Sequence, residues 1–275
     1  MTMSFPHTAL TDARISAWSQ AHIDPLEVQP ITARLAGAGS LRLELEALLA
    51  AAPTHASSDD YRNLLLKENV AGKASAMGRM WAWKRLKLRY ALDPTLVEHQ
   101  AFVKAMRSSP DPTDRGLVSF LMFARTDRLF REVTLERVSP HLQNEDTTIE
   151  PSAIEVAVRS RMQTAGLCWS AATLERAHNH LLTALKDFGV VRGSRHRRTI
   201  RLRPGGQTTL FACWLGHYQG LTDRQVLDSP WFRLLGIDFQ QTADLLYVAH
   251  RQGLLGFRMQ ADVVELSLPP IGGSR

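Results

Sequence analysis

The hydrophobic positions of the chain recur mostly at helical spacing, and the breaks between the periodic segments are short and polar. This pattern predicts helices over 40–52, 58–71 and 75–92, each ended by a proline or glycine break. Three successive helices joined by short breaks are typical of a helix-turn-helix unit. Residues 1–30 carry three prolines and are weakly periodic, so we expect an arm there, with a short helix over 13–21.

The same periodicity continues over 94–107, 113–124 and 126–142, which predicts three further helices. A polar segment, QNEDTTIEPS at 143–152, follows them and is the best candidate for a domain junction. Beyond it, a long helix is expected to begin after Ser170, whose hydroxyl can cap the first turn.

The chain after this junction repeats the order helix, glycine stop, apolar pair and hairpin. Residues 181–204 align with residues 245–269, and Gly189 then stands opposite Gly253. We interpret both segments as the end of a winged-helix-like unit. The alternative is a chance similarity between two helix-to-hairpin junctions.

These patterns predict a mainly α, multi-helix protein with helix-turn-helix units and small β-hairpin wings in its C-terminal half. Its expected parts are an N-terminal arm at 1–30, an N-terminal helical domain with a helix-turn-helix at 31–145, a winged-helix-like unit with a basic wing at 146–206, and a second winged-helix-like unit at 207–275. A chain of 275 residues with 44% hydrophobic content is long enough to bury a substantial core.

The positive charge of the chain is concentrated in two short windows. The formal net charge is only +6, yet residues 67–90 hold seven bases and one acid, and residues 192–203 hold six arginines, one histidine and no acid. The rest of the chain is therefore net negative. Such local concentration indicates an anionic partner at these two windows.

The helix predicted over 75–92 has apolar residues around most of its circumference and leaves one stripe of small and basic residues. Small residues would let this helix approach another surface closely, and its arginines could reach phosphates or guanine edges. The alternative is a core helix whose long basic side chains extend into water. The candidate nucleic-acid-binding residues of this region are Lys73, Ser75, Arg79, Arg85 and Arg89.

The second basic window alternates in a way that a disordered tail would not need. In RRTIRLR, Ile200 and Leu202 share one face, and Thr199 shares the other face with the flanking arginines, which predicts a half-buried strand packed against the helix at 170–188. A wing of this kind lies along the DNA backbone or in the minor groove. A solvated cationic hairpin is the alternative. The candidate residues here are Arg192, Arg195, Arg197, Arg198, Arg201 and Arg203.

The sequence offers no convergent set of reactive groups, and we assign no catalytic residue, metal or cofactor. His178 and His180 stand two apart on a predicted helix and face different directions. The turn PGGQTT lacks the spacing of a phosphate-binding loop, and Cys168 has no activating neighbour, so we expect a buried structural thiol. The two distant cysteines favour a reducing cytoplasm, and no apolar run is long enough to cross a membrane.

Four successive blocks of the sequence resemble the BrxA family, a component of bacterial BREX phage-exclusion systems. They are ITARLAGAGSLRLELEALL, YRNLLLKENVAGKASAMGRMWAWKRLKLRYALDP, ARTDRLFREVTLERV and LCWSAATLERAHNHLLTALKDFGVVRG, and they cover about 31–203. The family block after the second helix usually reads L-G-K-R-S-x-S-T. Here Gly72, Lys73 and Ser75 match it, whereas Ala74 departs from it and the later serine and threonine are absent.

The resemblance implies a mainly helical, non-enzymatic protein associated with DNA binding. We therefore expect a cytoplasmic, double-stranded DNA-binding accessory component of a BREX anti-phage defence system, with other BREX proteins as partners and no membrane contact. One alternative is an RNA-binding, antitermination-like factor, which would stack bases on exposed aromatics, whereas we expect Trp81, Trp83 and Tyr90 to be mostly packed. A second alternative is a protein–protein scaffold of the defence complex, whose basic patches would bind acidic partners.

Overall fold

The computed structural model describes residues 29–271, so most of the predicted arm, with its helix at 13–21, lies outside the described part of the chain. The helices are α2 (Arg34–Gly37), α3 (Arg42–Ala51), α4 (Ser58–Leu66), α5 (Ala76–Arg89), α6 (Val97–Ser108), α7 (Pro112–Thr126), α8 (Arg128–Arg137), α9 (Pro151–Thr164), α10 (Ala171–Asp187), α11 (Gly206–Tyr218), α12 (Asp223–Leu227), α13 (Pro230–Leu234) and α14 (Phe239–Arg251), with a short 3-10 turn η1 (Ser139–His141).

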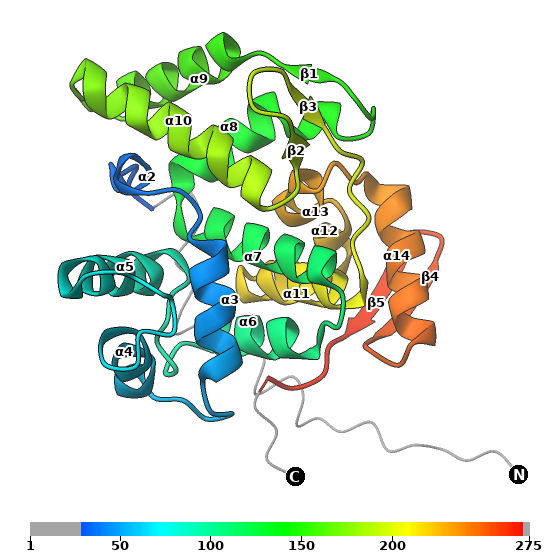
Figure 1. The fold of residues 1–275 in the computed structure, drawn as a ribbon. Helices are drawn as coiled ribbons and strands as arrows, with labels where there is room; N and C mark the ends of the chain where they lie inside the picture. Colours follow the sequence, from blue (N-terminus) through cyan, green and yellow to red (C-terminus); the bar gives the residue numbers. More distant parts are fainter. Residues whose placement is uncertain (1–28, 272–275) are drawn as a thin grey trace, which may run out of the picture.

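The strands are short and lie in the C-terminal half, so the predicted mainly α class is confirmed. They are β1 (Thr148–Ile149), β2 (Val191–Arg192), β3 (Arg197–Thr199), β4 (Gly256–Gln260) and β5 (Val263–Ser267). The first three form an antiparallel sheet in the order β1-β3-β2, and β4 pairs with β5 in a separate hairpin. Figure 1 shows the first sheet beside α9 and α10, and the second hairpin beside α14.

Side-chain caps fix where several helices begin. Ser75 accepts a hydrogen bond from the Gly78 amide at the start of α5, and Ser170 caps α10 as predicted. The cap of α4 is Ser57, one residue before the predicted helix start, because Ser57 and Asp60 bond each other's backbone amides reciprocally. This reciprocal pair of hydrogen bonds fixes the start of α4 at Ser58.

The two segments predicted as a repeat share their helix endings. The last two helices before each hairpin end at a glycine in the left-handed region, Gly166 and Gly189 in the first unit and Gly236 and Gly253 in the second. In each case the amide of the following residue bonds back to the last helical turn, the pattern of a Schellman motif. Both units therefore end in the order helix, left-handed glycine, helix, left-handed glycine, hairpin, and the second unit has α11 and α12 before it.

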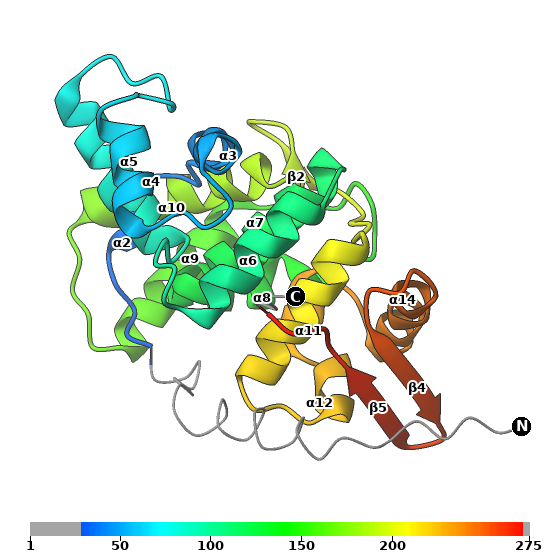
Figure 2. The same ribbon diagram turned by 90° about the horizontal axis from the view of Figure 1, so that it is seen from below.

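One hydrophobic core runs from Ile31 to Leu266 and passes through the expected domains without a break. At its centre, the rings of Phe120, Phe123 and Phe130 from α7 and α8 pack against Phe188 at the end of α10. Figure 2 shows α6, α7 and α11 side by side in the middle of the molecule, and α11 contacts both of its neighbours. The boundaries between the expected domains stay a prediction.

A buried carboxylate joins the N-terminal helices to the second unit. Asp114 of α7 accepts hydrogen bonds from the amides of Gly205, Gln207 and Thr208, which form the start of α11. The hydroxyl of Ser109 donates to the same carboxylate. A helix whose own cap residue is Gly205 thus receives its cap from a distant helix.

Candidate nucleic-acid interface

The predicted basic stripe of α5 is the packed face of that helix, not its free face. Ala82 is fully buried, and Arg89 is only 3% exposed. The Arg89 guanidinium donates to the carbonyls of Arg34 and Ala38 at 2.9 and 2.6 Å and lies over the ring of Phe123. Burial lowers its pKa. Arg89 therefore anchors α2 and presents no group to solvent.

The other predicted residues of this region also have local partners. Lys73 forms an ion pair with Glu44, with 2.5 Å between Nζ and Oε1, and Ser75 is the cap of α5. Arg85 is half-buried, and its guanidinium lies so close to Gly37 that a Cβ there would stand 2.5 Å from Cζ. Arg79 is half-buried as well. Most of these side chains therefore contact neighbouring parts of the protein around α2, α3 and α5.

The face of α5 that does meet solvent is apolar with lysines at its side. Met77 is 78% exposed, Trp81 40% and Leu88 46%, and Lys84 lies between them on the same face. Trp81 was expected to be packed, and that expectation is wrong. Small residues on a helix mark close packing against any neighbour, and here α5 packs against α4 and α7 while its arginines reach the segment around α2.

A β2–β3 hairpin lies where the basic wing was predicted. Its turn needs Gly193, because a Cβ at that position would lie 2.3 Å from the carbonyl oxygen of His196. Arg195 and Arg198 are exposed. Arg192 is exposed too, and its ion pair with Asp146 raises its pKa. Arg192 and Arg198 stand opposite each other in the register of β2 and β3, and Arg195 lies in the turn between the two strands.

The second strand of the hairpin ends earlier than predicted, and one of its residues faces the other way. β3 ends at Thr199, which is fully buried rather than on the arginine face. Its hydroxyl donates to the carbonyl of Asn144 at 2.8 Å and accepts from the amide of Thr147 at 3.0 Å, so it ties the wing to the segment that contains β1. Arg197 shares this inner side, is half-buried, and has its pKa lowered by burial.

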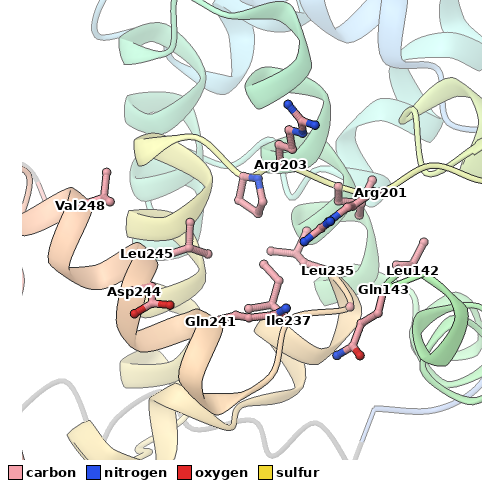
Figure 3. Close-up of a pocket in the computed structure, with 13 residues that line it drawn as sticks. Leu142, Gln143, Arg201, Arg203, Leu235, Ile237, Gln241, Asp244, Leu245 and Val248 are labelled. Atoms are coloured by element: carbon pink, nitrogen blue, oxygen red, sulfur yellow. The ribbon is translucent and has the colours of Figure 1, made fainter. Parts of the chain in front are cut away.

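Beyond β3 the predicted alternation holds without a strand. Ile200 and Leu202 are half-buried, whereas Arg201 and Arg203 are exposed. These two arginines run away from the wing along α14, as Figure 3 shows. The second basic window therefore divides into a wing group, Arg192 to Arg198, and a separate pair.

Sequence reasoning missed the open face of α10. Ala172, Glu175, Arg176 and Asn179 are exposed and recur at i, i+3, i+4 and i+7, which places them on one side of the helix. The periodicity of the buried leucines on this helix was the signal that could have identified them.

The other half of α10 is covered by the segment around α2. His180 Nδ1 lies 2.9 Å from the Leu35 carbonyl, and the Ser40 hydroxyl donates to Asp187 Oδ2 at 2.6 Å. The exposed polar residues of the N-terminal half of the helix, together with the β2–β3 hairpin, are therefore the candidate surface for a large ligand.

Other reactive groups are scattered. Cys168 is exposed, so the expectation of a buried thiol is wrong for it, whereas Cys213 is buried and its pKa is raised by burial. Among residues 29–271, no three histidine, cysteine, aspartate or glutamate side chains are grouped to hold a metal ion. Across the same described range, every helix is too short or too polar to cross a membrane.

The described chain is thus a mainly helical protein whose C-terminal half contains two helix-and-hairpin units, the first with an arginine-rich hairpin. Residues 29–205 match the family model of BrxA, which covers more than half of the chain, so the chain belongs to the BrxA family. This confirms the resemblance found over 31–203. Family membership gives the chain a role associated with BREX systems, and it suggests other BREX components as partners. A search of curated proteins finds no match.

Proposed function

We propose that this protein is a non-enzymatic, double-stranded DNA-binding accessory component of a BREX system, which binds the duplex through α10 and the β2–β3 hairpin. The observation that carries the proposal is the chain order β1, α9, α10, β2, β3 with the sheet order β1-β3-β2. This order supports the proposal because a winged helix has its second helix in the major groove and its hairpin on the backbone or in the minor groove.

The open face of α10 has the chemistry of base reading. Arg176 can bond the O6 and N7 acceptors of guanine, and Asn179 can bond the N6 and N7 groups of adenine. Both side chains are exposed on one face of α10. Glu175 on the same face would repel phosphate and accept a hydrogen bond from cytosine N4.

The wing supplies the phosphate contacts. Arg195 and Arg198 are exposed, Arg197 is half-buried beside them, and Arg192 can exchange its exposed carboxylate partner Asp146 for a phosphate. About four released counterions would make log affinity fall with log salt at a slope of about −4.

A duplex fits this surface better than single-stranded RNA does. Recognition of RNA loops relies on bases stacked against aromatic side chains. Neither α10 nor the β2–β3 hairpin contains a phenylalanine, tyrosine or tryptophan. The half-exposed Trp81 lies on α5, a different element.

The test is an anisotropy titration of a labelled duplex of about 20 base pairs over a salt series. The double variant Arg195→Ala/Arg198→Ala should bind at least tenfold more weakly near 0.1 M salt, with a salt slope smaller by about 2. The matched control is Arg251→Ala/Arg258→Ala, which removes the same charge from exposed positions of the second unit.

The control variant should keep the affinity and the slope of the unmodified protein. Equal affinity of the wing variant and the unmodified protein would refute this site. Tighter binding of single-stranded RNA than of the duplex would favour the RNA-binding alternative. No binding to either nucleic acid at low salt would leave the scaffold alternative.

A further inference from the structure

A groove of about 520 Å³ lies between α14 and the segment that follows β3. In Figure 3, Asp244, Leu245 and Val248 come from the helix on one side, and Arg201 and Arg203 come from the extended segment on the other. This volume is within the range of about 300 to 1,000 Å³ that is usual for ligand sites. The groove therefore has the size to hold part of a partner molecule.

The floor of the groove is aliphatic. Leu142, Leu202, Leu235 and Ile237 line it, and Leu245 borders it from α14. Val248 continues this apolar surface along the helix and is 39% exposed. Burying such side chains under a ligand is favourable by about 25 cal/mol for each Å² removed from water.

The rim of the groove carries unpaired cations. Arg201 and Arg203 are exposed, and within residues 29–271 neither guanidinium has an ion-pair or hydrogen-bond partner. Figure 3 shows Arg201 extending toward Leu235, whereas Arg203 points away from the floor. Gln143 and Gln241 also line the groove, and a side-chain amide can both donate to and accept from a peptide backbone.

These features select one class of ligand. Single-stranded nucleic acid needs aromatic stacking surfaces, and none of the lining residues is aromatic. A duplex backbone has no apolar group to cover the leucine floor. An extended peptide provides aliphatic side chains for the floor, amide groups for the glutamines and carboxylates for the arginines.

We propose that this groove binds an extended segment of a partner protein in which aliphatic and acidic residues are interspersed. An aliphatic side chain of the segment packs on Ile237 and Leu245, and its acidic side chains pair with Arg201 and Arg203. The site is separate from the DNA surface, since the wing arginines stand at the hairpin turn. Asp114 holds the arginine-bearing wall in place through its bond to the Gly205 amide.

The experiment is a selection of random ten-residue peptides, displayed on phage, against the immobilised full chain, with counter-selection against the variant Arg201→Glu/Arg203→Glu. The selected peptides are then synthesised and titrated by fluorescence anisotropy. We expect them to combine aspartate or glutamate with leucine, isoleucine or valine. Their affinity should fall at least tenfold in Arg201→Glu/Arg203→Glu and in Val248→Glu, a change at a half-exposed position that leaves the core intact.

The matched control is Arg195→Glu/Arg198→Glu, which makes the same charge change on the wing. This variant should bind the peptides normally and lose the duplex, whereas the groove variants should do the opposite; unchanged thermal unfolding of each variant shows that it is folded. Selection without an acidic and aliphatic consensus would overturn the proposal, as would peptides that bind all variants alike. Loss of duplex binding in Arg201→Glu/Arg203→Glu as large as in the wing variant would assign these arginines to nucleic acid instead.

Discussion

Replacement of Asp114 tests whether a side chain of α7 stabilises the start of α11. Its carboxylate is buried and accepts from the amides of Gly205, Gln207 and Thr208 at 2.9, 3.3 and 3.2 Å, and from the Ser109 hydroxyl at 2.9 Å. First-turn amides have no partner inside their own helix. Asp114→Ala therefore leaves several donors unpaired in the interior.

The size of the effect follows from which donors can reach water. Thr208 is fully buried, so leaving its amide without a hydrogen-bond partner lowers the free energy of unfolding by about 1 to 3 kcal/mol. Loss of the cap itself costs about 1 kcal/mol more. Gly205 and Gln207 are half-buried and can be hydrated at little cost. The sum is about 3 kcal/mol, which corresponds to a melting temperature lower by about 6 to 12 °C for a chain of this size.

Urea denaturation of the full chain, followed by circular dichroism, measures this difference in the free energy of unfolding. The matched control is Asp111→Ala, which removes an exposed cap of α7 with one local bond to the Thr113 amide and should cost about 1 kcal/mol. Asp114→Asn keeps one acceptor oxygen and should fall between the two. A loss in Asp114→Ala no larger than in Asp111→Ala would refute the reasoning.

Two further predictions concern pH and a steric limit. Burial lowers the pKa of His99 to about 4, so the folded protein binds its proton less readily than the unfolded chain does. The free energy of unfolding should therefore fall as the pH drops from 6.5 toward 4, by up to about 3 kcal/mol. Urea denaturation at several pH values should show this loss, and His99→Gln, which keeps a partner for the Tyr61 hydroxyl, should remove it; an unchanged pH profile would contradict the assignment. Gly236→Ala should lower the melting temperature more than Gly253→Ala does, because a Cβ at 236 would stand 2.4 Å from the Cβ of Leu142, whereas a Cβ at 253 meets nothing within 4 Å. Equal melting temperatures would show that Leu142 moves freely.

The sequence predicted the helices well because their signals are local. Caps such as Ser75 and Ser170 and stops such as Gly189 act within one helical turn, so neighbouring residues determine them. The short strand β1 was not predicted. It exists because Thr199 and its strand offer partners about 50 residues away, and a pattern within a polar loop contains no information about that pairing.

The candidate site was harder to predict, since composition does not show which face of a helix is buried. On α5 the arginines were assigned to a nucleic-acid-binding stripe, yet the side chain of Arg89 donates to carbonyls at α2 from inside the core. The hairpin turn was predictable because the turn glycine Gly193 is a local feature, whereas the alternation at 199–203 predicted a strand that the structure has at Arg197–Thr199 instead. Which arginines belong to the hairpin and which to the groove depends on the position of α14 in the tertiary structure, which local sequence patterns do not show.

The two C-terminal units share a framework and differ in the surfaces that they leave open. On α10 the open face is polar, with Arg176 and Asn179, and the hairpin that follows it carries exposed arginines. On α14 the open face holds Val248 and borders the aliphatic groove, and the hairpin arginine Arg258 lies 3.9 Å from Glu265. Selection for one partner cannot explain both surfaces, because phosphate binding gains nothing from an aliphatic floor. The two proposals together place a bound peptide segment next to the DNA surface, where one basic stretch of chain contributes to both sites.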